Sequence, residues 1–284
     1  MKNIRIALRI NALFSFTCGA LLLLLTGSMA DLFGTEILWP FQGVGIGLVL
    51  FAFSVWYEST RAPLHLSKVL VITALDLLWV AGSAVIVTAG LLDLTSAGYN
   101  LIAATAVPVC AFALHQSYGL SHAEAEAGNP RQKALRFTIG VDADRAAVWS
   151  VISDIENYHE VASNIDDVRH LAGEGEGMKR TCYSGSDSWT ETCTVWEPGR
   201  RYSFRVHTDA ADYPYPFSAL QGTWGIITDD TGNLQIEMIF ELEYQTYGHV
   251  LLVHPFMADR FRPVCRDLME AWKKRAEQDE VPVA

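Results

Sequence analysis

The pattern of hydrophobic positions changes near residue 120. Before that point, four apolar stretches each approach the ~20 residues that a helix needs to cross ~30 Å of hydrocarbon. Short polar turns separate the stretches, and aromatic residues typical of a membrane interface lie near their ends. The sequence therefore predicts a bundle of four membrane-spanning helices over residues 1–120, with spans at Ile4–Met29, Ile37–Tyr57, Val69–Leu92 and Tyr99–Tyr118.

The basic residues of this half predict its orientation. Lys2, Arg5 and Arg9 precede or open the first span, and Arg61 and Lys68 lie between the second and third. The other two connections carry acidic charges only, so the positive-inside rule places the N-terminus in the cytoplasm. Four spans then return the C-terminal half to the same side. We expect an integral protein of the bacterial inner membrane with a cytoplasmic C-terminal domain.

The first span has a competing interpretation as a cleavable signal peptide. A basic start, the run Leu21–Leu25 and the small residues around Ala30 fit that pattern. The stretch is long and three more spans follow, which favours a retained helix. Cleavage would leave three spans and the same cytoplasmic location for the C-terminal domain.

Polar residues within the spans are candidates for an intramembrane site. A carboxylate such as Asp76 is costly in hydrocarbon unless it is paired or protonated, and Asn11, Thr73, Gln42 and His115 are its candidate partners. The alternatives are a proton or ligand site and a hydrogen bond that fixes the bundle, and the absence of a second acid in these spans favours the latter. The glycines at 43, 45 and 47 predict close helix packing.

After residue 120 the pattern becomes that of a soluble domain. Residues 121–133 are small and polar and predict a linker, followed by a domain over residues 134–280. A strand, a helix begun by Asp142 and a second short helix come first. Strands punctuated by Gly and Asp then follow, and a helix from His249 to Gln278 closes the chain. In the last strand, Leu234–Tyr244, apolar residues alternate with glutamates, so one face is buried and the other is wet.

This order predicts an α+β helix-grip domain, a curved antiparallel sheet around a long C-terminal helix, preceded by an all-α four-helix transmembrane bundle. The chain resembles the START-like (SRPBCC) polyketide cyclase and lipid-transport group over about residues 134–278. The carrying segments are Val141-Asp142-Ala143, Ile155-Glu156-Asn157-Tyr158, Gly173–Gly177, Trp196-Glu197-Pro198-Gly199 and Gly222-Thr223-Trp224. The resemblance implies binding of a lipid, isoprenoid quinone or polyketide-like molecule, and supplies no catalytic set.

A strongly curved sheet leaves a cavity against its helix, and alternation along the strands predicts which side chains line it. The expected lining residues are Trp189, Phe204, Trp224, Met238, Phe240, Leu242, Phe261 and Leu268. Two unusually apolar segments predict a cavity mouth that faces the bilayer or the bundle, formed by Tyr215, Phe217, Val253 and Phe256. The alternative is that the apolar residues of the second segment pack under the sheet.

Catalytic residues remain unknown at this stage. Glu191, Arg205 and His207 lie on adjacent predicted strands and would suit acid–base work if they converged. However, Arg205 and His207 alternate with Phe204, so an inward aromatic face would turn both toward solvent.

Composition narrows the function classes. Residues 129–284 carry 16 Lys/Arg and 25 Asp/Glu, which excludes an electrostatic nucleic-acid binder. The five cysteines show no metal-ligand spacing, and a Cys182–Cys193 disulfide is disfavoured in a cytoplasmic domain. We expect no metal and no cofactor. The expected partners are the bilayer, a hydrophobic small molecule, and a second copy or membrane partner that could dock on the bundle.

The leading hypothesis is membrane-anchored binding or transfer of a hydrophobic small molecule. The rivals are a cyclase- or aromatase-like enzyme and a membrane sensor or assembly protein. An apolar cavity favours a carrier, whereas buried and converging His, Arg and Glu side chains favour an enzyme.

Overall fold

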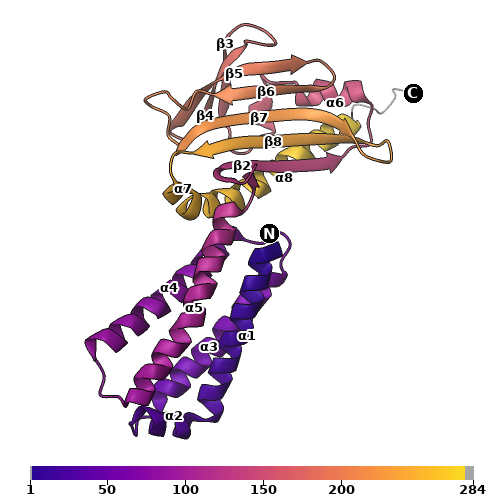
Figure 1. The fold of residues 1–284 in the computed structure, drawn as a ribbon. Coiled ribbons are helices and arrows are strands. Elements are labelled where there is room, and N and C mark those ends of the chain that lie inside the picture. The colour runs from indigo at the N-terminus through magenta and orange to yellow at the C-terminus, as the bar shows by residue number, and fades with distance from the viewer. Residues whose placement is uncertain (1, 279–284) are drawn as a thin grey trace. The chain divides into compact units, whose positions relative to one another are not determined.

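The computed structural model describes residues 2–278 and divides the chain into two compact units, Met1–Ala123 and Glu124–Ala284 (Figure 1). The first unit is helical, and the second combines one antiparallel sheet with helices.

The helical unit contains four helices long and apolar enough to cross a membrane, as the hydrophobic pattern predicts. The first predicted span is divided at Leu25 into a long and a short helix. The third and fourth begin about three residues earlier than predicted. The helices are α1 (Lys2–Leu24), α2 (Thr26–Phe33), α3 (Trp39–Thr60), α4 (Leu66–Ala89) and α5 (Ser96–His122).

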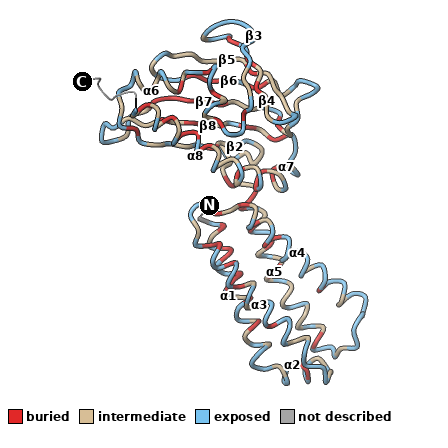
Figure 2. Tube along the Cα trace, turned by 180° about the vertical axis from the view of Figure 1, so that it is seen from behind, coloured by how far each residue is buried: buried red, intermediate tan, exposed pale blue. Residues whose placement is uncertain are grey.

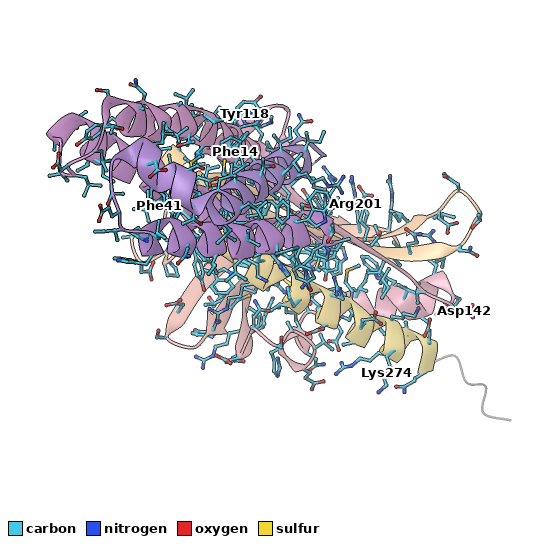
Figure 3. The ribbon with its side chains drawn as sticks, turned by 90° about the horizontal axis from the view of Figure 1, so that it is seen from below. Phe14, Phe41, Tyr118, Asp142, Arg201 and Lys274 are labelled. Atoms are coloured by element: carbon cyan, nitrogen blue, oxygen red, sulfur yellow. The ribbon has the colours of Figure 1, made fainter. Side chains whose placement is uncertain are left out.

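Small residues allow the helices of this unit to approach closely. A Cβ added to Gly19 of α1 would lie 2.8 Å from the carbonyl oxygen of Gly45 in α3. A Cβ on Gly119 of α5 would collide with Ile4 of α1. Gly45 thus packs as its position predicts, whereas Gly43 and Gly47 face open space. Larger side chains complete the packing, including Phe14, labelled in Figure 3, which makes an edge contact with Phe112.

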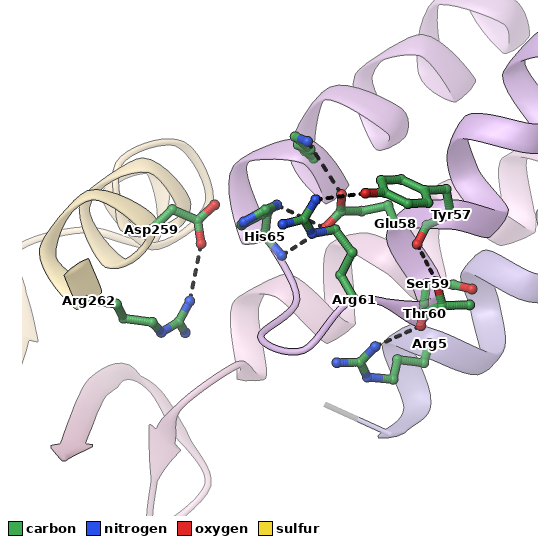
Figure 4. Close-up of polar contacts among 10 residues, drawn as sticks. Arg5, Tyr57, Glu58, Ser59, Thr60, Arg61, His65, Asp259 and Arg262 are labelled. Carbon is green, nitrogen blue, oxygen red and sulfur yellow. Dashed lines mark hydrogen bonds and ion pairs between the residues drawn. The ribbon is translucent and has the colours of Figure 1, made fainter. Parts of the chain in front are cut away.

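Glu58 fixes the turn between α3 and α4. This buried carboxylate accepts a hydrogen bond from the backbone N–H of His65 at 2.9 Å and lies 3.7 Å from the Lys68 ammonium (Figure 4). Arg5 of α1 donates to the carbonyl of Ser59 at 2.7 Å. Arg5 of α1 and Lys68 of α4 therefore both lie near the C-terminal end of α3.

The second unit contains one eight-stranded antiparallel sheet, in the order β1-β2-β8-β7-β6-β5-β4-β3 (Figure 1). The first long strand pairs with the last, and the remaining strands follow one another as a meander. The strands are β1 (Ala125–Glu126), β2 (Asn129–Gly140), β3 (Asp167–Ala172), β4 (Lys179–Ser184), β5 (Asp187–Glu197), β6 (Arg201–Val206), β7 (Phe217–Thr228) and β8 (Leu234–Tyr244).

Much of the segment expected to be a linker belongs to structured elements. Helix α5 continues to His122, and residues 125–140 form a hairpin of β1 and β2. Ala127 and Gly128 at its turn both have positive φ, at 48° and 74°. Such a pair is the backbone of a two-residue type I′ turn, whose twist matches that of the flanking strands. The sheet therefore begins within a few residues of the end of α5, the last helix of the helical unit.

Helices close one face of the sheet. Helix α6 (Arg145–Ile152) and the 3₁₀ turn η1 (Tyr158–Glu160) follow β2, and α7 (Tyr247–Leu252) and α8 (His254–Gln278) follow β8. The N-cap of α6 is Asp144 rather than the expected Asp142, because the Asp144 carboxylate accepts the N–H of Ala147 at 2.7 Å. Buried residues of α8, seen as red stretches in Figure 2, pack on the inner sheet face: Cys265, Leu268, Met269, Trp272 and Ala276.

Candidate functional site

The inner face of the sheet and helix α8 bring together the expected lining residues except Leu242, which is buried but borders a groove outside this cluster. On β8, the side chains at alternate positions are buried, as the alternation of apolar and acidic residues predicts. Among the expected lining residues, Phe204, Trp224, Met238, Leu242 and Leu268 are buried, and Trp189, Phe240 and Phe261 are partly buried.

Aromatic rings occupy the space between the sheet and α8. Trp224 of β7 makes an edge contact with Phe240 of β8 at 5.6 Å between ring centroids, and Phe240 contacts Phe261 of α8 at 4.9 Å. Tyr202 of β6 stacks on Trp224 at 5.2 Å. The lining residues therefore contact one another in this conformation, and a bulky ligand would have to displace the partly buried Phe240 and Phe261 rings.

A buried ion pair lies in this aromatic interior. Arg180 of β4 and Glu191 of β5 are directly opposite in the strand register, and Arg180 Nε donates to Glu191 Oε2 at 2.9 Å. The side chains are only 3% and 9% exposed. Trp189 Nε1 donates to the other carboxylate oxygen at 2.7 Å. The guanidinium also lies 4.0 Å from the ring centroid of Phe204, a favourable cation–π geometry.

Some hydrogen-bonding capacity in this interior is unused. Arg180 Nη1, Trp224 Nε1 and the Tyr213 hydroxyl are buried and have no hydrogen-bond partner among the described residues. A buried donor without a partner costs about 1–3 kcal/mol, and more when it is charged. These three groups could each donate to an oxygen atom of a bound molecule.

The protonation states of the interior groups favour hydrogen-bond donation to a ligand over acid–base chemistry. Burial lowers the pKa of Arg180, but the Glu191 carboxylate outweighs it, so the pKa lies above its usual range. Burial raises the pKa of the Tyr158 and Tyr202 hydroxyls. It also raises the pKa of the Cys182 thiol. At neutral pH the interior therefore presents one permanent cation and protonated hydroxyls and thiols.

The catalytic grouping considered from the sequence is not assembled. Glu191 faces inward, whereas Arg205 is exposed on the opposite face of the sheet. His207 lies 2.8 Å from the Thr192 hydroxyl on that outer face. Sequence reasoning missed Arg180, although its alternation with Cys182 on a strand beside Glu191 could have placed it inside.

An aromatic row joins the ion pair to the start of α8. Ring contacts link Trp189 to Tyr215 at 5.8 Å, Tyr215 to Phe217 at 6.4 Å, Phe217 to Tyr244 at 5.0 Å, and Tyr244 to His254 at 5.6 Å. This row contains two expected mouth residues, Tyr215 and Phe217. The other two lie beside its end: Val253 is partly buried and Phe256 is exposed.

Hollows in the described part of the sheet unit include a small pocket and a wider groove. A pocket of about 50 Å³, room for a few water molecules, lies where the loop after β6 covers β5, and Trp189, His207 and Tyr213 help to line it. A wider groove of about 590 Å³ is lined largely by polar side chains of the outer sheet face, including Arg205, Gln221 and Glu241. Neither hollow is the apolar chamber expected between the sheet and α8.

A second buried polar cluster lies in the helical unit. Asn11 Nδ2 of α1 donates to Asp76 Oδ2 of α4 at 2.7 Å, and Gln116 Nε2 of α5 donates to the same oxygen at 3.1 Å. The Thr73 hydroxyl donates to Gln116 Oε1 at 2.8 Å, and that of Ser15 donates to Asn11 Oδ1 at 3.1 Å. Three helices are thereby joined through one carboxylate.

Of the three intramembrane polar residues singled out from the sequence, Asn11 and Asp76 meet, and His115 does not join them. His115 is exposed on α5, as is Gln42 on α3. The sequence missed Gln116, the immediate neighbour of His115. The helical period of 3.6 residues could have distinguished the two, because Gln116 shares a face with the buried Ala113 and Leu120.

Metal-ligating residues do not cluster in the described part of the chain. No group of three or more His, Cys, Asp or Glu side chains with metal-site geometry occurs within residues 2–278. All five cysteines are free thiols, including Cys182 and Cys193.

The fold and interior define a helix-grip domain with an aromatic core and one buried ion pair, preceded by four helices able to span a membrane. Sequence comparison then gives the family. Residues 133–277, about half of the chain, match the family described as polyketide cyclase/dehydrase and lipid transport, and the chain belongs to it. None of the curated proteins matches the sequence.

Solved structures with a similar fold include aromatase/cyclases. The Zhui aromatase/cyclase from a Streptomyces species is 18% identical, with a TM-score of 0.42 over 52% of this chain and 94% of that one. The di-domain aromatase/cyclase StfQ of steffimycin biosynthesis is 8% identical, with a TM-score of 0.46 over 63% of this chain and 60% of that one. A protein from Thermus thermophilus is 14% identical, with a TM-score of 0.41 over 52% and 99%.

Proposed function

We propose that the helix-grip domain binds a hydrophobic small molecule that carries an oxygen acceptor, such as a quinone, a polyketide-like ring or an oxygenated lipid. The observation that carries the proposal is the buried Arg180 guanidinium, whose Nη1 has no hydrogen-bond partner among the described residues and lies inside an aromatic interior. A carbonyl or carboxylate oxygen of a ligand would satisfy it, while the aromatic rings would cover the apolar part.

Binding fits these groups better than catalysis does. A general base near neutral pH needs a matched pKa, whereas burial here raises the pKa of the tyrosines and of Cys182. Arg205 and His207 face away from the interior. The domain is therefore proposed to hold its ligand without transforming it.

The helical unit is proposed to anchor the domain in the bacterial inner membrane, with both termini in the cytoplasm. Arg5 bonds to the end of α3, and Lys68 lies beside Glu58 at that same end. A single basic end supports a cytoplasmic location for it. A membrane anchor would keep the domain next to the bilayer in which a lipophilic ligand dissolves.

The proposal is tested by native mass spectrometry of the full chain purified in mild detergent. We expect a co-purifying molecule of low polarity with at least one oxygen, and its mass should remain unchanged during prolonged incubation. A short-chain naphthoquinone serves as a direct probe, since quinone binding near Trp224 should quench tryptophan fluorescence.

A matched pair of variants separates recognition from stability. Replacing both members of the ion pair, in Arg180→Leu/Glu191→Leu, should keep the fold, because apolar replacement of a whole buried pair is often tolerated. This variant should lose affinity for the naphthoquinone. The outer-face variant Arg205→Leu is the control and should bind like the unaltered protein. Equal binding by all three would contradict the proposal, and a progressive change in ligand mass would favour the enzyme.

A further inference from the structure

Helices α7 and α8 meet at a corner whose outer surface is apolar. Tyr247, Leu252 and Phe256 are 60%, 64% and 53% exposed, although residues of their size are mostly buried in soluble domains. Hydrogen bonds from Val253 N to the His249 oxygen and from Met257 N to the Val253 oxygen carry the helical pattern across the junction. Leu252 and Phe256 therefore lie one turn apart. We call these three residues the apolar corner.

The exposed residue one turn after Phe256 on the same side of the helix is an arginine, Arg260. Arg260 is exposed and follows Phe256 by four residues, so it lies one turn further along. Arg260 forms no ion pair with any residue in the described part of the chain. An apolar helical surface that ends in an arginine is typical of elements at a lipid interface, where the guanidinium meets phosphate and the apolar groups enter the acyl boundary.

Polar contacts with Glu124 tie the corner to the chain that follows α5. His254 Nε2, beside the corner, lies 3.1 Å from Glu124 Oε2, and Arg262 pairs with the other oxygen of that carboxylate. His254 is fully buried, and the Tyr244 hydroxyl lies 3.2 Å from its other ring nitrogen. The Arg262–Glu124 ion pair and the contact of His254 with the same carboxylate hold this segment within the sheet unit.

Chain length then limits the distance between the corner and the membrane. Glu124 is the second residue after α5 ends at His122, and Tyr118, one turn earlier, is of the type that marks a membrane interface. One helical turn and two extended residues together reach roughly 12 Å. Given the anchoring proposed above, with Tyr118 at the membrane interface, His254 would lie near the bilayer surface whatever the orientation of the domain.

We infer that the apolar corner of Tyr247, Leu252 and Phe256 inserts into the headgroup–acyl boundary of the bilayer, with Arg260 at the phosphates. The inference rests on the membrane anchoring proposed above. Insertion would place the end of the aromatic row, which leads inward from Tyr244 to Trp189, at the lipid surface. A ligand dissolved in the bilayer could then reach the interior without crossing water.

The test uses nitroxide labels on the full chain in vesicles of phosphatidylethanolamine and phosphatidylglycerol. Single cysteines replace Leu252 or Phe256 in a background with Cys18→Ala and Cys110→Ala; the other three native cysteines are buried. The matched control is Leu171, an equally apolar residue that is 55% exposed on the edge strand β3. Collision rates with lipid-soluble oxygen and with a water-soluble nickel complex report the surroundings of each label.

We expect the oxygen-to-nickel collision ratio at both corner positions to exceed that at Leu171 several-fold. A corner ratio equal to that at Leu171 would place the corner in water and overturn the inference. Low rates with both reagents would mean that protein, either the bundle or a second copy, covers the corner, and would overturn it as well. Phe256→Glu should lower the ratio measured at Leu252, because a carboxylate opposes insertion.

Ligand content distinguishes this inference from the proposed function. Mass spectrometry in detergent detects a bound molecule whether or not the corner enters a bilayer. A co-purifying ligand together with a corner in water would reject only the insertion. An inserted corner together with an empty domain would reject only the proposed ligand binding.

Discussion

The two units of the chain each bury a carboxylate, and they satisfy it in opposite ways. In the bundle, Asp76 accepts from two amides, whose own oxygens accept from Ser15 and Thr73. In the helix-grip domain, Glu191 is paired, but its partner Arg180 keeps a nitrogen with no acceptor among the described residues. A saturated network fixes packing, whereas an unsaturated one has capacity left for a ligand. This difference supports the proposal that the Asp76 cluster fixes the packing of the helices and that the Arg180–Glu191 cluster binds a ligand.

The largest effect is expected from Arg180→Ala. Removal of the guanidinium leaves Glu191 as an unpaired buried charge, which should cost about 3–5 kcal/mol of unfolding free energy. Chemical denaturation of the full chain in detergent measures it. Arg180→Leu/Glu191→Leu should recover most of that loss, and a loss below about 1 kcal/mol in the single variant would show that water reaches the pair.

Asp76→Leu should have a smaller effect, about 1–2 kcal/mol. The substitution leaves the amides of Asn11 and Gln116 without their acceptor, and hydrogen bonds between membrane helices contribute about 0.6 kcal/mol each on average. Asp76→Asn keeps an acceptor oxygen and should cost less. Thermal unfolding in detergent compares the two variants. If both Asp76 variants were equally destabilised, the negative charge would matter more than the hydrogen bonds. The proposal that Asp76 only fixes the packing of the helices would then be wrong.

Tyr202→Phe provides a reference inside the domain. The Tyr202 hydroxyl donates to the Ile152 carbonyl at 2.6 Å and is a satisfied polar group close to the unsatisfied one. Its loss should cost about 1 kcal/mol, as for an ordinary hydrogen bond. Binding of the naphthoquinone should be retained, in contrast to the variant without Arg180. A loss of binding together with unchanged stability would move recognition from Arg180 to Tyr202.

The smallest effect concerns pH and a third buried group. Burial lowers the pKa of His254 despite the nearby Glu124 carboxylate, with Lys133, Arg262 and Tyr244 also close. The unfolded chain therefore binds a proton more readily, and stability should fall as pH drops through about 6.5, the ordinary histidine value. Melting temperatures at mildly acidic and neutral pH test this. His254→Gln should flatten the dependence between these values, and an unchanged slope would assign it to other groups.

The sequence predicts most of the fold because its patterns are strong. Strict alternation in Leu234–Tyr244 predicts which residues lie on the inner face of β8. The length of the apolar stretches predicts the four helices that could cross a membrane. The boundaries of the elements are harder to predict. The N-cap of α6 is Asp144 and not the predicted Asp142, because either carboxylate suits an N-cap and only backbone geometry distinguishes them. The hairpin at Ala127 was missed because alanine rarely adopts the positive φ found there.

The candidate site was harder to predict than the fold. Arg180 was overlooked because an arginine inside a core depends on a carboxylate eleven residues away, and only strand register brings the two together. Gln116 was overlooked in favour of His115, whose side chain can titrate but which faces outward. In both cases the position of the residue in its element decides whether the side chain is buried. Strand register buries Arg180, and the helical period buries Gln116 and exposes the titratable His115.

The pairing of β2 with β8 has a consequence for synthesis. Phe137 and Met238 are direct partners, about 100 residues apart in the chain. At a translation rate of about 5–20 residues per second, β2 waits roughly 5–20 s for its only long neighbour. During that time the helices of the bundle have already emerged and can enter the bilayer. With the proposed anchoring, membrane insertion would precede folding of the sheet, and the unfinished domain would spend its aggregation-prone interval already tethered to a membrane.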